Sequence, residues 1–89
     1  MPSIGQWDSD LGVAWFIPRE IIPKVTKNGK PYWILKVIDD QSSSVSIKCW
    51  GVREGDSVHL NRPYAAKLDH SEDWGFSTRS IKHTFKLLG

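Results

Sequence analysis

Residues 26–50, TKNGKPYWILKVIDDQSSSVSIKCW, decide the fold of this chain. Near their start an Asn-Gly pair, Asn28 and Gly29, lies between two runs that are rich in β-branched and aromatic residues. Such a pair supplies the positive φ angles that a tight type I′ turn demands. The stretch therefore predicts a β-hairpin that reverses at Asn28 and Gly29.

Two β-strands are predicted after this turn. Residues 31–39 are dense in β-forming side chains and lead into a polar turn that contains Asp39, Asp40 and three serines. Residues 45–50 alternate with period two between small or apolar and polar or aromatic side chains. This alternation predicts Val45, Ile47 and Cys49 on one face of the strand and Ser46, Lys48 and Trp50 on the other.

The flanking segments predict three more strands. Residues 13–26 are rich in β-formers, but Pro18 and Pro23 interrupt them, which suits a bent strand and excludes a helix interior. No segment of the chain shows a convincing 3.6-residue period. The fourth strand, the fifth strand and a polar N-terminal arm are expected at residues 57–68, 74–87 and 1–12, respectively.

The length and the strand pattern predict a single small barrel. A chain of 89 residues has room for one domain. Five short strands must hide their edges, and closure into a barrel does so. The meander of the first three strands, with a bend in the first, favours an all-β, five-stranded OB-type barrel over an SH3-like one. An OB-fold domain is therefore expected over residues 13–89.

The composition excludes several classes of protein. A net charge of +2, with 39% apolar and 25% charged residues, is typical of a soluble globular domain. One cysteine and three scattered histidines give no disulfide, no zinc-ligand spacing and no nucleophile arrangement, so no catalytic residue, metal or cofactor is predicted. No apolar run approaches the ~20 residues of a membrane span, and the N-terminus lacks the pattern of a signal peptide. A cytoplasmic protein that is not an enzyme and has no membrane association is expected.

The central stretch resembles a known family. A T-K-x-G-K hairpin, an apolar strand that ends in aspartate and a strand that ends in an aromatic residue occur within residues 26–50, and Glu54-Gly55-Asp56-Ser57-Val58 follows. This pattern resembles the OB domains of bacterial and phage C-family replicative DNA polymerase alpha subunits. It is also similar to the anticodon-binding barrels of class II aminoacyl-tRNA synthetases, where an aromatic residue and an arginine occupy the places of Ile34 and Ile38.

The resemblance implies that the exposed face of the second and third strands binds single-stranded nucleic acid. On that face it implies Ile34, Lys36, Ile38, Ser46, Lys48 and Trp50. Lys36, Lys48 and Trp50 are expected at the centre of the face and Lys27 and Lys30 at its edge, because a ring accepts a base and a cation neutralises phosphate. Loop cations that are expected to add phosphate contacts are Lys27, Lys30, Arg53, Arg62 and Arg79.

Other conspicuous residues are expected to have structural roles. Trp15 and Trp33 are expected to fill the barrel, and Trp74 to cap it. The Asp39-Asp40 pair is expected to cap a turn rather than to bind magnesium, since adjacent carboxylates in a strand point to opposite faces. Cys49 is expected to be buried and inert.

Two functions remain open at this point. The first is a module that binds single-stranded nucleic acid, with DNA favoured, and that is a domain or accessory part of a DNA replication polymerase with other replication proteins as partners. The second is a protein-interaction module that docks a partner on Ile34, Ile38 and Trp50 of the same face. The fold alone does not choose between them.

Overall fold

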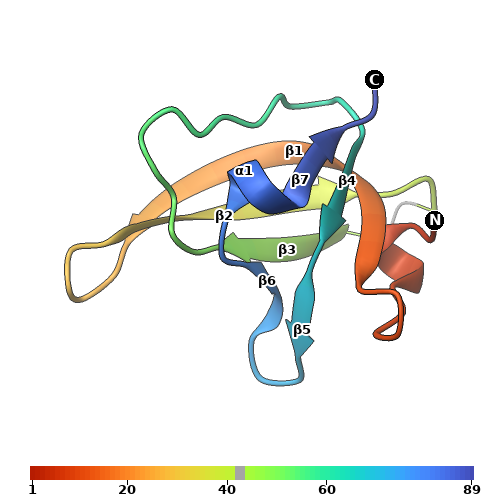
Figure 1. The fold of residues 1–89 in the computed structure, drawn as a ribbon, viewed down its shortest axis with the longest axis horizontal. Helices are drawn as coiled ribbons and strands as arrows, with labels where there is room; N and C mark the ends of the chain where they lie inside the picture. Colours follow the sequence, from red (N-terminus) through yellow and green to blue (C-terminus); the bar gives the residue numbers. More distant parts are fainter. Residues whose placement is uncertain (42–43) are drawn as a thin grey trace.

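The computed structural model of the chain describes residues 1–41 and 44–89, and it is mostly β (Figure 1). No helix in this described part is long and apolar enough to cross a membrane. The elements in chain order are η1 (Ile4–Gln6), β1 (Val13–Val25), β2 (Pro31–Ile38), β3 (Ser44–Cys49), β4 (Tyr64–Lys67), β5 (Asp69–Ser71), β6 (Gly75–Thr78), α1 (Ile81–Thr84) and β7 (Phe85–Leu87).

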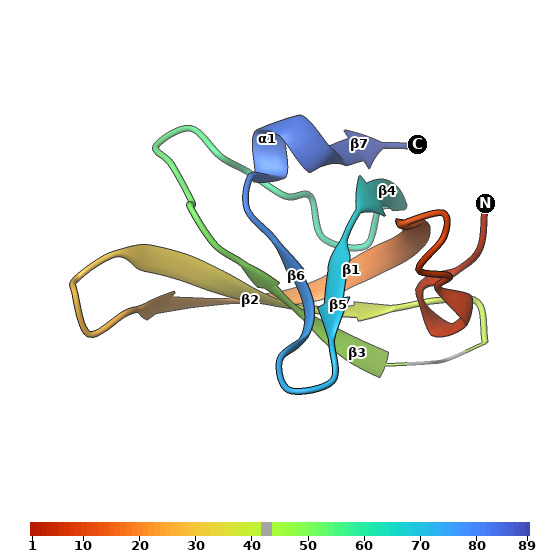
Figure 2. The same ribbon diagram turned by 60° about the horizontal axis from the view of Figure 1, so that its bottom comes forward.

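The seven strands form one mixed sheet in the order β5-β6-β3-β2-β1-β4-β7. All neighbouring strands are antiparallel except β3 and β6, which are parallel. The sheet curls around the core into an open half-barrel (Figures 1 and 2). Its two ends are the short strands β5 and β7.

The first three strands form the predicted meander, and their predicted bounds agree with the structure to within one residue. The first half of β1 pairs with β4 and its second half with β2. A bulge between Pro18 and Glu20 accompanies the change of partner. Pro18 has no backbone N–H to donate to a neighbouring strand. The bulge provides the bend that the prolines predicted.

The β1–β2 turn differs in type from the prediction. Gly29 has a φ of +81°, but Asn61 is the only non-glycine residue of the described chain with a positive φ, so Asn28 does not adopt the type I′ conformation. The Gly29 N–H donates to the Thr26 carbonyl at 2.9 Å, and the Thr26 N–H donates to the Lys30 carbonyl at 2.9 Å. This is a type I turn followed by a glycine bulge, which needs only one left-handed residue.

The prediction of a closed, five-stranded barrel is wrong. The predicted fourth strand, 57–68, keeps only the four residues of β4, because Pro63 cannot donate to a ladder and Asn61 has a φ of 65°. After Leu68 the chain leaves the edge of β1 and begins to pair with β6 instead. The sheet therefore remains open between β5 and β7.

The predicted fifth strand, 74–87, is also divided. It contains β6, the one-turn helix α1 and β7. The Thr84 side chain donates to the Ser80 carbonyl at 2.6 Å, and the Thr84 N–H donates to the same carbonyl at 3.1 Å. These two bonds close a helical turn that a pattern of β-formers does not reveal.

The N-terminal segment, expected as an arm, packs on the sheet instead. Ile4 is 1% exposed and belongs to the core, and the Trp15 N–H donates to the Pro2 carbonyl at 3.0 Å. The Trp7 ring lies edge-on to Phe76, with ring centroids 5.4 Å apart. Two apolar side chains thus tie residues 1–12 to the half-barrel.

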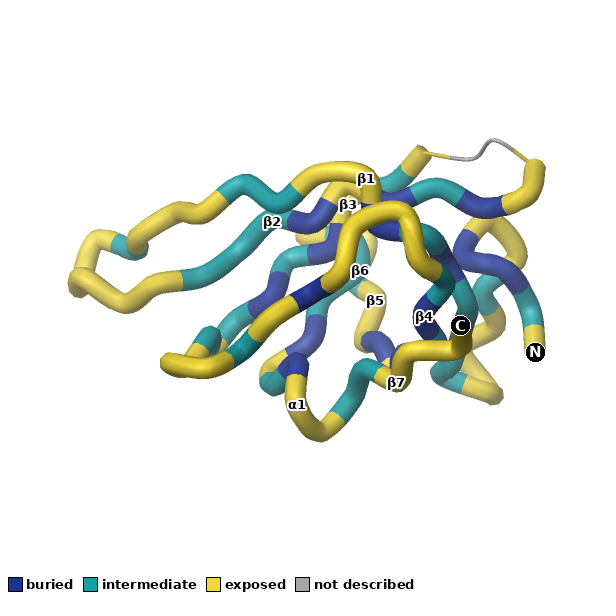
Figure 3. The backbone as a smooth tube through the Cα atoms, turned by 90° about the horizontal axis from the view of Figure 1, so that it is seen from above, coloured by how far each residue is buried: buried dark blue, intermediate teal, exposed yellow. Residues whose placement is uncertain are grey.

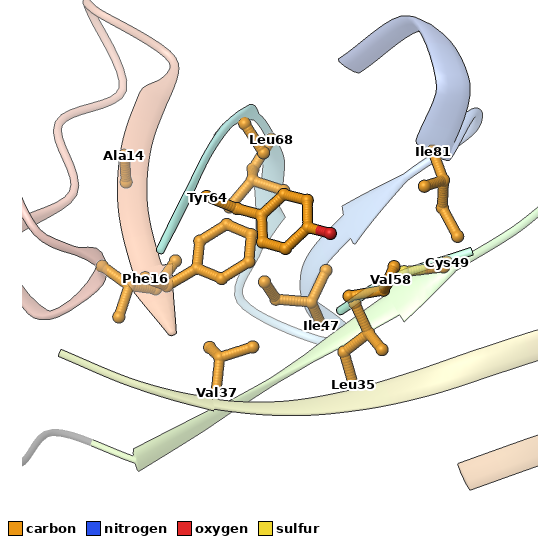
Figure 4. Close-up of a cluster of buried hydrophobic side chains, with 12 residues drawn as sticks. Ala14, Phe16, Leu35, Val37, Ile47, Cys49, Val58, Tyr64, Leu68 and Ile81 are labelled. Carbon is orange, nitrogen blue, oxygen red and sulfur yellow. The ribbon is translucent and has the colours of Figure 1, made fainter. Parts of the chain in front are cut away.

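The core lies inside the curl (Figure 4). Its side chains come from alternate positions of the strands, from α1 and from the loop before β4: Ala14, Phe16, Leu35, Val37, Ile47, Cys49, Val58, Tyr64, Leu68 and Ile81. Trp33 packs against this core as predicted. Trp15 does not fill the barrel, because it alternates with the buried Ala14 and Phe16 and so lies on the outer side of β1.

Candidate nucleic-acid interface

The outer face of β2 and β3 carries the residues that the resemblance implied. Leu35 pairs with Ile47 on the buried side of the sheet, so the positions between them point outward. The pairs on the outer side are Ile34 with Lys48, Lys36 with Ser46, and Ile38 with Ser44. Lys36 and Ser46 are exposed, whereas Ile34, Ile38, Lys48 and Trp50 are half-buried.

One end of this face forms an aromatic–cation cluster, made of Tyr32, Lys48, Trp50 and Trp74. The Lys48 Nζ lies 4.8 Å from the Trp74 ring centroid and 6.0 Å from that of Trp50. The Trp50 and Tyr32 rings are tilted at 37°, with centroids 4.6 Å apart. An ammonium at these distances is attracted to the ring faces, so the lysine is held among the rings.

Trp74 reaches the cluster through the parallel pairing of β3 and β6. Lys48 pairs with Ser77, and the β5–β6 turn that precedes Gly75 therefore lies beside β3. The Asp73 N–H donates to the Ser71 hydroxyl at 3.2 Å, which orders this turn. The Trp74 side chain is 65% exposed, so it does not cap the barrel as the sequence led us to expect.

The loop lysines Lys27 and Lys30 lie in the β1–β2 turn, next to this end of the face. The turn projects from one side of the molecule, and both lysines are exposed (Figures 1 and 3). The Lys30 N–H donates to the Thr26 hydroxyl at 3.1 Å, which fixes the backbone but leaves both ammonium groups in solvent. The turn thus places two solvated charges beyond Tyr32.

The opposite end of the face has a different electrostatic character. Lys36 has Glu20 of β1 and Ser46 of β3 as its cross-strand neighbours. Directly opposed side chains of a sheet have Cβ atoms only about 5 Å apart. A carboxylate therefore occupies the position across from Lys36, and no ring takes part in the pairing on either side.

The three arginines predicted to contact phosphate lie in different parts of the structure. Arg79 lies beside the aromatic–cation cluster, because the Trp50 N–H donates to the Thr78 carbonyl at 2.8 Å. A Cβ at Gly51 would lie 2.7 Å from the Arg79 carbonyl oxygen, so this close approach requires glycine. Arg53 lines a groove near α1. Arg62 follows Asn61, whose N–H donates to the Pro18 carbonyl of β1 at 2.7 Å. Neither of the last two joins the cluster.

The remaining polar groups have structural surroundings. The Asp39 carboxylate accepts hydrogen bonds from the Gly5 and Gln41 N–H groups, both at 3.0 Å, which fits the turn-capping role expected of it. Burial, together with the Asp56 carboxylate, raises the pKa of the Cys49 thiol to about 12. In the part of the chain that the structure describes, no three His, Cys, Asp or Glu side chains lie together as a metal site would require.

Comparison with family models, curated proteins and solved structures found no match to this chain. The geometry adds two residues to the site that the sequence did not indicate, Tyr32 and Trp74. Tyr32 could have been found from the alternation along residues 31–39, since it shares the outward parity of Ile34 and Lys36. No local signal indicated Trp74, because its position depends on the β3–β6 pairing.

Proposed function

We propose that this chain is a module that binds single-stranded nucleic acid, with DNA as the favoured ligand, on the outer face of β2 and β3. The observation that carries the proposal is the aromatic–cation cluster, in which the Lys48 Nζ lies 4.8 Å from the Trp74 ring centroid and 6.0 Å from that of Trp50. Single strands are bound by rings that accept bases and by cations that neutralise the phosphates between them. The cluster contains both kinds of group, since the Lys48 ammonium lies within 6.0 Å of two tryptophan ring centroids.

The arrangement of the rings supports a strand that crosses β3. Trp74 is largely exposed, so one face of its ring is free to receive a base. A base on Trp74 and another near Trp50 would leave the intervening phosphate close to the Lys48 ammonium. Lys27 and Lys30 extend the positive surface beyond Tyr32 and would contact the backbone further along the strand.

We further propose that the half-barrel is of the OB type. OB folds are five-stranded, partly open Greek-key barrels that bind ligands with the face of strands two and three and with the loops after strands one and four. The meander β1–β2–β3 and the pairing of β1 with β4 support this relationship. Only Leu68 separates β4 from β5, so the two segments correspond to one interrupted fourth strand of an OB fold.

The role as a non-catalytic part of a DNA replication polymerase, with other replication proteins as partners, is proposed from the resemblance of residues 26–50 alone. Protein docking on the same face has less support. It would use Ile34, Ile38 and Trp50, but all three are half-buried, whereas the Trp74 ring of the aromatic–cation cluster is 65% exposed. A ring beside an ammonium suits a nucleotide better than an apolar partner surface.

The test is the binding of a fluorescein-labelled, fifteen-nucleotide oligothymidine, followed by anisotropy at about 50 and 200 mM salt. We expect saturable binding that weakens as salt rises, and a loss of ~1–3 kcal/mol in Trp50→Ala with little change in salt dependence. Leu11→Ala, which removes an exposed side chain outside the site, is the control. Equal affinity of parent and folded Trp50→Ala would contradict the proposal.

A further inference from the structure

β7 is a free edge of the sheet. It pairs with β4 on one side, through Ala66 with Phe85 and Tyr64 with Leu87, and it is the last strand in the sheet order of the described residues. Leu87 is 39% exposed and the following Leu88 is 47% exposed. Edge strands are usually blunted by charge, proline or a covering segment, because their unpaired N–H and C=O groups bind other strands.

A groove of about 580 Å³ lies along this edge, between β7, α1 and the loop 53–59. Its apolar lining is the open end of the core, made of Tyr64, Ile81, Phe85 and Leu87. The Phe85 ring is in contact with the Phe16 ring, with centroids 5.4 Å apart, so this lining is continuous with the interior. A side chain that enters the groove from an added strand would therefore bury apolar surface.

The segment that forms α1 and β7 carries charge of one sign, whereas the loop 53–59 across the groove carries both signs. Residues 80–89 contain Lys82 and Lys86 and no Asp or Glu. Lys86 pairs with Ala65 on the outer side of the sheet, opposite in direction to Phe85 and Leu87. The other free edge, β5, carries Asp69 and leads into an acidic turn. The two edges therefore favour different partners.

We propose that β7 binds an extended, acidic segment of a partner protein as an additional strand. Its acidic side chains lie on the outer side beside Lys86, and its apolar side chains alternate with them and cover Phe85 and Leu87. This orientation also keeps the carboxylates away from Glu54 and Asp56 on the far wall of the groove. The surface is separate from the aromatic–cation cluster, so the proposal does not depend on the proposed function.

A peptide fits this edge better than a nucleic-acid strand does. The Phe85 N–H donates to the Ile81 carbonyl, so the free edge of β7 offers the Leu87 N–H and the Phe85 and Leu87 carbonyls. A second peptide has both donors and acceptors to pair with these groups. A phosphodiester backbone offers acceptors only, and the Tyr64 and Phe85 rings of the groove lining are buried and half-buried, respectively. Basic charge alone would attract either polymer, but the edge and the apolar lining select the peptide.

The experiment uses a labelled, ten-residue peptide that alternates aspartate with valine, and a control peptide that alternates lysine with valine. We expect the acidic peptide to bind at concentrations up to about 1 mM, and Lys86→Glu to weaken it by at least about tenfold. Lys36→Glu, on the outer face of β2, should leave the peptide affinity unchanged. In ¹⁵N-resolved NMR spectra, the amides of residues 85–88 should shift.

Backbone methylation tests the added strand itself. Two further peptides carry N-methyl groups, one on every aspartate and the other on every valine, so each loses the N–H groups of one strand edge. Only one of the two should lose affinity. Equal binding of both, equal binding of the lysine peptide, or no binding by the acidic peptide would overturn the proposal. The proposal would also be overturned if an oligothymidine shifted the amide signals of residues 85–88 and the acidic peptide did not.

Discussion

The outer face of β2 and β3 carries one lysine near each end, and the two lysines differ in their neighbours. Lys48 lies among the Tyr32, Trp50 and Trp74 rings, whereas Lys36 lies between Glu20 and Ser46. Both point outward by the same alternation, so the strand pattern assigns them the same role. A lysine on the outer face is therefore not by itself a binding residue, because its neighbours decide whether its charge is available and whether a base can stack beside it.

The strongest test of the comparison removes the rings. If Trp50 and Trp74 each stack on a separate base, Trp50→Ala and Trp74→Ala should each cost ~1–3 kcal/mol in oligothymidine affinity, and the double variant should cost roughly the sum. Anisotropy titration of the four proteins measures this cycle. A double variant no weaker than the worse single variant would mean that both rings contact the same base.

The next test concerns the turn that places Lys27 and Lys30 beside the cluster. Gly29 has a φ of +81°, and a Cβ there would meet no atom within 4 Å, so only the backbone conformation opposes a side chain. Gly29→Val should lower the free energy of unfolding by ~1–2 kcal/mol, because a β-branched residue is strained in the left-handed region. Urea unfolding measures the change.

Gly29→Asn is the matched variant for this test. Asparagine tolerates the left-handed region far better than valine does, so it should cost clearly less. Equal decreases in the two variants would indicate that side-chain bulk, rather than the sign of φ, is what the turn resists.

The sequence predicted the N-terminal half of the sheet well and the C-terminal half poorly. β1, β2 and β3 are long enough for alternation and turn residues to define them, so positions such as Ile47 and Cys49 were assigned to the correct face. β4 to β7 have only three or four residues each, too few for a period to be recognised. Their pairing depends on contacts between residues far apart in the chain.

The same limit explains what was missed in the site. Lys48 and Trp50 were found because their parity is local, and Tyr32 was available from the same argument. Trp74 joins them only because β6 runs parallel to β3, which no residue near Trp74 encodes. The burial of Ile4 was missed for a similar reason, since a single apolar residue in a polar segment has no periodicity.

A smaller effect is expected from the central charge. Lys48→Ala should reduce the slope of log K against log salt by ~0.7, the value for one phosphate contact on a single strand. Lys67→Ala, which removes an exposed lysine from β4, should leave the slope unchanged and serves as the control. A weaker affinity of Lys48→Ala with an unchanged slope would mean that the lysine orients the rings without contacting phosphate.

The smallest effect is expected at the other end of the face. Lys36→Ala should change the salt slope by clearly less than Lys48→Ala does, because the Glu20 carboxylate at the paired position of β1 would repel a phosphate that approaches Lys36. Glu20→Gln sharpens the test, since it removes the carboxylate and keeps the side-chain size. In that background Lys36 is free to contact phosphate, so affinity should rise and a further Lys36→Ala should then lower the slope by up to ~0.7. If Lys36→Ala already lowers the slope by ~0.7 with Glu20 intact, the strand crosses both ends of the face equally. In that case the rings, and not the carboxylate, would be the only difference between the two lysines.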